Sequence, residues 1–145
     1  MRWMRYLDES GGGWGLVEGD RMIELAAGPF EGPPAPTGAS RPLAFVCADV
    51  PFVPRTFYAA GLNYATHVRE MAERRGEPPT LPAKPDMGYR AVNALVAHDA
   101  AVVIPSDATQ VQYEGELVVV IGREAKHLAE ADALSCVLGY TIGNA

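Results

Sequence analysis

Residues 113–122, Tyr-Glu-Gly-Glu-Leu-Val-Val-Val-Ile-Gly, join two glutamates to an unbroken apolar run. Because side chains alternate between the two faces of a strand, Glu114 and Glu116 point the same way, about 7 Å apart along the chain. The run from Leu117 to Ile121 is typical of a strand that is buried on both faces. We therefore expect a buried strand that begins with two carboxylates on one face.

Two carboxylates placed in this way repel each other and resist transfer out of water. A hard divalent cation, Mg²⁺ or Mn²⁺, would compensate their charge, since both ions prefer carboxylate oxygens and water as ligands. The alternative is a pair of solvated glutamates at an exposed strand end. The spacing of Glu114 and Glu116 leaves both interpretations open.

Composition restricts the class of protein. The 145 residues are 48% apolar and 21% charged, which suits one packed domain or a small module attached to an incomplete larger one. A net charge of −6 argues against nucleic acid or an anionic membrane as partner.

No apolar stretch approaches the ~20 residues of a membrane span, and residues 1–6 lack the apolar centre of a signal peptide. Cys47 and Cys136 fit neither a disulfide framework nor a zinc pattern, so we expect two buried thiols in a cytoplasmic protein.

The first part of the chain reads as a small β module. Trp3 and Trp14 are expected to anchor its core rather than to bind a ligand. Residues 28–40 are rich in proline and glycine and predict a linker or long surface loop. We therefore expect a small N-terminal domain over residues 1–50 and a second domain over residues 51–145. The strands predicted in the module are residues 3–7, 14–18 and 21–25.

Strand signals outweigh helix signals in the second part, which indicates a β-rich α+β fold. The clearest helix covers residues 64–75, with Asn63 as its expected N-cap. His67 and Glu70 are i and i+3 neighbours on one face of this helix. The other predicted elements are strands over residues 55–60, 101–104 and 139–142 and a helix over residues 130–137.

Four segments, in order, resemble the motifs of the fumarylacetoacetate hydrolase family. Residues 61–70 resemble its GxNYxxHxxE signature, and residues 82–85 resemble its LKP segment. Residues 113–122 resemble its YExEL…VIG strand, and residues 139–144 resemble its GYTxxND turn. The first 50 residues resemble the small domain that precedes this core in bacterial 2-hydroxyhepta-2,4-diene-1,7-dioate isomerase-like members.

The resemblance implies a mixed β-sandwich roll that binds one divalent cation, Mg²⁺ or Mn²⁺. It implies a hydrolase, decarboxylase or isomerase of small 2-oxo or 2-hydroxy-dienoic acids, as in the breakdown of aromatic compounds. Glu114 and Glu116 would be metal ligands, His67 the base that activates water, and Glu70 its orienting partner. Lys84 would lie near the substrate.

The chemistry is consistent with these residue types. A cation on the 2-oxo and carboxylate oxygens of a substrate stabilises an enolate, through which all three reactions pass. A histidine suits proton transfer at neutral pH, and such general-base help is worth ~10²–10⁴ in rate. The alternatives are an exposed helix histidine beside a glutamate for His67 and an ordinary surface lysine for Lys84.

The sequence also departs from the family pattern. Ala145 stands where the family has the aspartate that is its third metal ligand, and the family core continues for a further stretch. A fragment, a natural half that needs a second chain, and a degenerate copy are all compatible with this. Because a half-domain leaves strand edges and apolar faces uncovered, we expect a homodimer or completion by a second chain. The alternative to an enzyme is a catalytically silent module that works by association.

Overall fold

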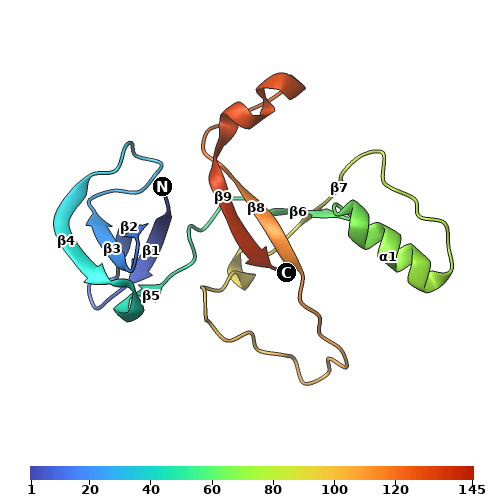
Figure 1. The fold of residues 1–145 in the computed structure, drawn as a ribbon, viewed down its shortest axis with the longest axis horizontal. Helices are drawn as coiled ribbons and strands as arrows, with labels where there is room; N and C mark the ends of the chain where they lie inside the picture. Colours follow the sequence, from blue (N-terminus) through green and yellow to red (C-terminus); the bar gives the residue numbers. More distant parts are fainter. The chain divides into compact units, whose positions relative to one another are not determined.

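Alternating apolar residues near the N-terminus build a five-stranded antiparallel sheet in the order β4-β3-β2-β1-β5 (Figure 1). The computed structural model describes residues 1–145. Two strands, β1 and β3, have the predicted bounds, and β2 begins one residue earlier than predicted. The strands are β1 (Trp3–Leu7), β2 (Gly13–Glu18), β3 (Arg21–Leu25), β4 (Pro36–Pro42) and β5 (Cys47–Ala48), with a 3-10 turn over Leu43–Phe45.

The core of this sheet is small and apolar. Its buried side chains are Tyr6, Leu16, Met22 and Leu25, and Met22 has no exposed surface. Trp3 and Trp14 lie beside it, half-buried, with their rings edge to face and 6.4 Å between centroids. The two tryptophans thus pack together as expected of core anchors.

Two predictions are wrong, one for the segment 28–40 and one for the two cysteines. The segment 28–40 is not only a linker, because Pro36 begins β4, which pairs with β3 along the edge of the sheet. An edge strand tolerates proline, since its outward N–H groups have no partner to lose. The two cysteines are not buried: Cys47 is exposed and Cys136 is half-buried, and both are free thiols.

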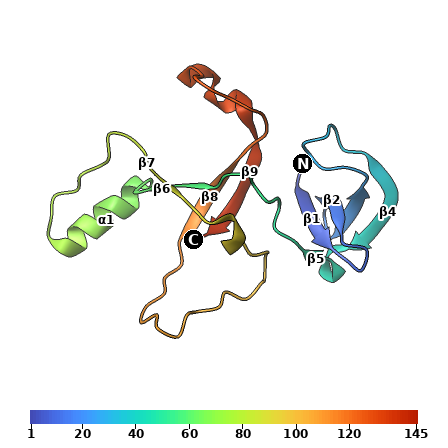
Figure 2. The same cartoon turned by 180° about the vertical axis from the view of Figure 1, so that it is seen from behind.

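The chain divides into two compact units. Residues Val50–His98 form one, and Met1–Asp49 together with Asp99–Ala145 form the other. In the first of these units β6 (Tyr58–Gly61) pairs with β7 (Asp86–Tyr89), and α1 (Ala65–Arg75) lies between them in sequence (Figure 2). A 3-10 turn follows at Val92–Ala94. The predicted strand over residues 55–60 therefore begins later and ends at Gly61.

The helix α1 begins one residue later than predicted, ends where predicted, and has a different N-cap residue. Tyr64, not Asn63, is the N-cap residue, and no side chain caps the helix start. At the other end Gly76 adopts a left-handed conformation, with φ of 67°, and its N–H bonds to the Ala72 and Glu73 carbonyls. Glycine suits this position because it has no Cβ to clash.

Residues near the C-terminus form a two-stranded antiparallel sheet. Its strands are β8 (Gly115–Ile121) and β9 (Val137–Asn144), with a bulge beside Val120. The helix predicted over residues 130–137 is a 3-10 helix over Glu130–Cys136. Arg123 fastens it to the end of β8, because its guanidinium donates to the Ser135 hydroxyl at 2.6 Å and carbonyl at 3.0 Å.

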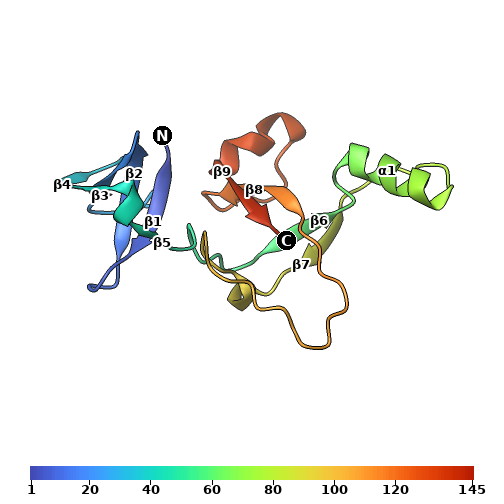
Figure 3. The ribbon, with the colours of Figure 1, turned by 60° about the horizontal axis from the view of Figure 1, so that its bottom comes forward.

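Two strand predictions fail here for the same reason. The strand β8 is not buried on both faces, since Leu117, Val119 and Ile121 are exposed. Residues 101–104 form no strand and lie in the long irregular connection before β8 (Figure 3). Both segments have the side chains of buried strands but lack the neighbouring strands and covering layer that would bury them.

No helix of the structure combines the length and the apolar character needed to cross a membrane.

Candidate functional site

The register between β8 and β9 gathers three positions on one face. Glu116 lies opposite Gly143, and Gly115 lies opposite Asn144. The Ala145 N–H donates to the Glu114 carbonyl at 3.0 Å, so the pairing continues for one more residue. Because directly opposed residues share a face, Glu114, Glu116 and Ala145 all point to the same side of this sheet.

The Asn144 side chain stabilises the β8–β9 pairing at the start of β8. Its side-chain Oδ1 accepts a hydrogen bond from the Glu114 backbone N–H at 2.9 Å. The bond fixes the backbone of Glu114 at the point where β8 begins. The asparagine of the GYTxxN motif was visible in the sequence, but its contact with Glu114 depends on the strand register and could not be predicted.

The two glutamates have no cationic partner. The arginines of the N-terminal module pair with other carboxylates, those of Asp8, Glu24 and Asp49. Glu116 is half-buried and Glu114 is exposed. Two neighbouring carboxylates without a counter-charge form a site that attracts a cation.

The second group of predicted residues belongs to the unit Val50–His98. His67 and Glu70 lie about one turn apart on α1, and both are exposed. Val68, between them in sequence, is the only buried residue of the helix. The exposed face of α1 therefore presents the imidazole and the carboxylate to solvent.

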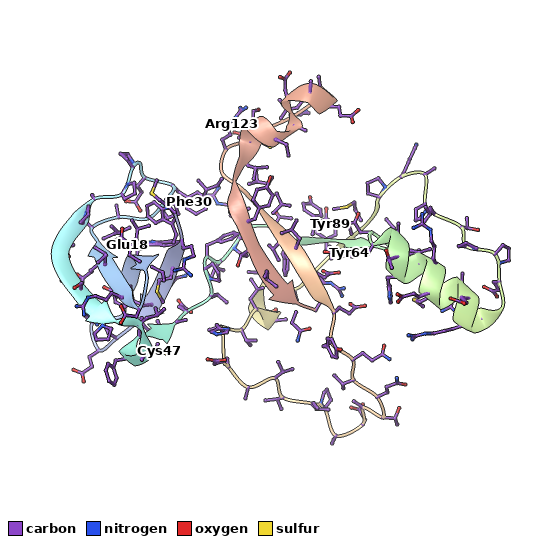
Figure 4. All side chains as sticks on the ribbon, viewed as in Figure 1. Glu18, Phe30, Cys47, Tyr64, Tyr89 and Arg123 are labelled. Carbon is purple, nitrogen blue, oxygen red and sulfur yellow. The ribbon has the colours of Figure 1, made fainter.

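Lys84 lines a hollow of about 280 Å³. The segment Leu81–Pro85 forms one side, and Gly61, Leu62, Asn63 and Ala65 form the other. The hollow thus joins two of the sequence motifs immediately before the helix that carries His67. Figure 4 labels Tyr64, the cap residue at this end of α1.

Sequence reasoning missed two features of this unit. Leu62 has a left-handed backbone conformation with φ of 52°, which is unfavourable by about 1–2 kcal/mol for such a residue. No sequence signal marks it, since leucine is not typical of that conformation. Tyr58 and Tyr89, the second of which is labelled in Figure 4, lie opposite each other on β6 and β7. Their ring centroids are 4.9 Å apart, and the ring planes are tilted by 37°. The hydrogen bond between the Tyr58 and Tyr89 side chains stabilises the protonated phenol and so raises the pKa of Tyr58.

The structure therefore brings the predicted residues together in two groups. Glu116 lies on β8, and Glu114 directly precedes the strand, where its carbonyl pairs with the Ala145 N–H. Lys84 shares a hollow with the loop that leads to His67 and Glu70. The first group can bind a cation. The second offers a proton acceptor and a positive charge suited to a small carboxylic acid.

Comparison with known proteins identifies the family to which this chain belongs. Residues 56–145 match the fumarylacetoacetate (FAA) hydrolase C-terminal family, and residues 1–46 match the Rv2993c-like N-terminal family. The chain belongs to the fumarylacetoacetate hydrolase family. Enzymes of this family generally use a divalent metal.

Individual relatives are similar over most of this chain. Protein Rv2993c of Mycobacterium tuberculosis is 39% identical over 121 residues, which are 83% of this chain and 43% of that protein. The homoprotocatechuate catabolism bifunctional isomerase/decarboxylase of Escherichia coli is 37% identical, over 89% of this chain and 29% of the relative. The crystal structure of 5-carboxymethyl-2-hydroxymuconate delta-isomerase from Mycobacterium smegmatis superimposes with a TM-score of 0.81 at 36% identity.

The likeness confirms the predicted fold class, a β-rich roll of the fumarylacetoacetate hydrolase type that is incomplete here. The Mycobacterium smegmatis structure covers 99% of this chain, but this chain covers only 54% of that structure. This chain thus spans about half the length of its solved neighbours, and less than half of the curated relatives named above.

Proposed function

We propose that this chain contributes to a metal-dependent enzyme that isomerises, decarboxylates or hydrolyses small 2-oxo or 2-hydroxy-dienoic acids in aromatic catabolism. The observation that supports this most is the pair of carboxylates at the start of β8, Glu114 directly before the strand and Glu116 within it, without a counter-charge. The relatives point to the same chemistry, since their names include isomerase/decarboxylase and caffeoylpyruvate hydrolase. The free thiols favour a cytoplasmic location.

Each residue has a role in this proposal. His67 takes a proton from water or substrate, and Glu70, one turn away, orients the imidazole and balances its charge. Lys84 pairs with a carboxylate of a substrate held in the hollow. These roles need a small acid with at least one carboxylate, which agrees with a 2-oxo acid.

This chain supplies only some of the ligands that the divalent cation, Mg²⁺ or Mn²⁺, needs. Its residues in this chain would be Glu114 and Glu116, and no group of three histidine, cysteine, aspartate or glutamate side chains stands ready to hold a metal. Ala145 occupies the third position on their face and offers no ligand atom. The residues present therefore do not make a complete metal site, and affinity is expected to be low.

The first experiment measures thermal unfolding with Mn²⁺ or Mg²⁺, each with and without oxalate, which mimics an enolate. Saturation at about 100 times the dissociation constant stabilises the folded chain by ~2.7 kcal/mol. The proposal predicts a metal-dependent shift that grows with oxalate and disappears in Glu114→Gln/Glu116→Gln. An unchanged transition at every metal and oxalate concentration would contradict it.

A gain-of-binding variant tests the geometry directly. Ala145→Asp places a third carboxylate on the face of Glu114 and Glu116, so calorimetry should show Mn²⁺ binding roughly tenfold tighter, about 1.4 kcal/mol. Ala145→Asn is the matched control, because it adds a side chain of similar size without the charge. Equal affinities for the two variants would contradict the shared face.

Ala145 also favours a second candidate function, a catalytically silent module that works by association. A module of this kind would bind its partner equally well when His67→Gln and Glu70→Gln are introduced. The enzyme, in contrast, should lose about 10²–10⁴ in rate on His67→Gln, measured with a 2-oxo acid by absorbance.

A further inference from the structure

The backbone of Leu62, in the loop between β6 and α1, is strained. Its φ of 52° lies in the left-handed region, which a bulky residue rarely adopts. The two other non-glycine residues with positive φ, Asp99 and His127, are of types that tolerate this region better. Strain of this kind gathers at functional sites, so we expect the leucine side chain to have a role that glycine could not fill.

The Leu62 side chain lines the hollow beside Lys84, and this hollow lies entirely within one compact unit of the chain. Leu62 is 52% exposed, and Leu81, from the segment that carries Lys84, is 46% exposed. Two large apolar side chains thus border the hollow without being buried. Together with Pro82 and Pro85 they form what we call the apolar lining.

The hollow contains little charge. Lys84 is the only charged residue that lines it, and Asn63 is the only other polar one. The hollow therefore has a partner for one carboxylate but none for a second. A second carboxylate against the apolar lining would lose water without gaining a partner, which is unfavourable. With a volume of about 280 Å³, the hollow suits a small ligand.

We propose that Leu62 determines specificity, so that the hollow prefers 2-oxo acids with one carboxylate and an apolar tail over dicarboxylic acids. The inference rests on the proposed function for the class of ligand and for the pairing of Lys84 with its carboxylate. The tail packs on Leu62 and Leu81 and removes apolar surface of both from water, which is favourable. This contact is the physical reason for a leucine at a position where glycine would avoid the strain.

The test compares two acids of equal chain length, 2-oxohexanoate and 2-oxohexanedioate, which differ by a carboxylate at the end of the tail. Each is titrated into the 145-residue chain without metal, and the amide resonances of Leu62, Ala65 and Lys84 are followed by NMR. The monoacid should bind roughly tenfold tighter than the diacid, because the apolar lining favours only the apolar tail. Binding without metal keeps this measurement independent of catalysis and of the metal titration that tests the proposed function.

Two variants separate the effect of the Leu62 side chain from that of its backbone. Leu62→Gly removes the side chain and the strain together, so the melting temperature should not fall, while the two acids should bind within about threefold of each other. Leu62→Met keeps an apolar side chain of similar size and should preserve the preference for the monoacid. Val53→Gly is the matched control, since Val53 is 62% exposed in the same unit but does not line the hollow. It should leave the preference unchanged.

Lys84→Gln distinguishes this inference from the proposed function. It should weaken the binding of both acids to a similar extent, because it removes the partner of the carboxylate that both share. If it changed neither affinity, the role of Lys84 in the proposed function would be wrong, whereas a preference for the monoacid that Leu62→Gly abolishes would still support the role of Leu62.

Three results would overturn the inference. The first is equal affinity for the two acids, or tighter binding of the diacid, in the wild-type chain. The second is a preference for the monoacid that Leu62→Gly leaves unchanged. The third is the absence of resonance shifts with both acids, which would mean that the hollow binds neither.

Discussion

At the scale of single residues, Asp8 is the most strongly perturbed acid of the chain. Its carboxylate accepts hydrogen bonds from the Ser10 hydroxyl at 2.6 Å and the Ser10 and Gly12 N–H groups, and it pairs with Arg41 at 3.0 Å. The Ser10 hydroxyl, chiefly, lowers the pKa of Asp8 from 3.8 to about 2. The carboxylate thus ties the turn after β1 to Arg41 on β4.

The pKa of Asp8 predicts how stability depends on pH. Because the folded pKa lies below the unfolded value, ionised Asp8 stabilises the folded chain above pH 3.8, and this contribution is lost as the pH falls towards about 2. Asp8→Asn should lower the melting temperature at neutral pH and flatten its fall between about pH 4 and 2. Glu9→Gln is the control with the charge removed one residue away. The prediction would be contradicted if the melting temperatures of wild type and Asp8→Asn fell equally steeply over this pH range.

Position 12 requires glycine for two reasons, its backbone conformation and the closeness of the Tyr6 backbone. Its φ is +88°, and an added Cβ would lie 1.9 Å from the Tyr6 carbonyl oxygen. Gly12→Ala should therefore destabilise the N-terminal sheet by about 2–4 kcal/mol in thermal unfolding. Gly19→Ala, at φ of +59° with open space around it, should lose only about 1 kcal/mol. Similar losses at the two positions would show that Gly12 has room to relax.

At the scale of elements, α1 is held weakly. It has 11 residues, no side-chain cap at its start and one buried residue, Val68. Helices shorter than about 12–15 residues are marginal without packing. Amides of α1 should exchange with deuterium roughly 100-fold faster than those of β2 and β3, which pack around Met22. Equal protection of α1 and the strands would contradict this.

A weakly held α1 suits the role proposed for it. The helix that carries His67 and Glu70 can become ordered when a substrate fills the hollow beside Lys84. The groups that transfer the proton would then be in position only when the substrate is bound. The same exchange experiment with oxalate and Mn²⁺ would reveal such ordering as slower exchange in α1.

At the scale of the whole molecule, apolar burial is concentrated in one sheet. Four of the six buried apolar residues, Tyr6, Leu16, Met22 and Leu25, lie there, and Val68 and Val120 are the others. Both tryptophans belong to the same sheet. Tryptophan fluorescence therefore reports the unfolding of the N-terminal sheet alone.

This concentration predicts unequal effects of two core substitutions. Met22→Ala should lower the free energy of unfolding followed by tryptophan fluorescence by about 2–5 kcal/mol, because it opens a cavity at a fully buried site. Val120→Ala should leave that transition unchanged and alter only the circular dichroism of the remaining structure. A fluorescence transition equally sensitive to both would indicate one cooperative core.

The sequence by itself determined the features that depend on neighbouring residues. Alternation placed β1 and β3 at their observed bounds, and the motifs indicated the family that comparison confirmed. The roles of His67, Glu70, Lys84, Glu114 and Glu116, and the division at residue 50, stay predictions.

Only the tertiary structure decided which segments have partners. It paired the proline-rich β4 with β3, left residues 101–104 unpaired, exposed the apolar side chains of β8, and set Ala145 opposite Glu114. The physical reason is that side-chain alternation is a local property of the backbone. Burial and strand pairing depend on residues distant in sequence, which must be present and correctly placed before a strand-like segment becomes a strand.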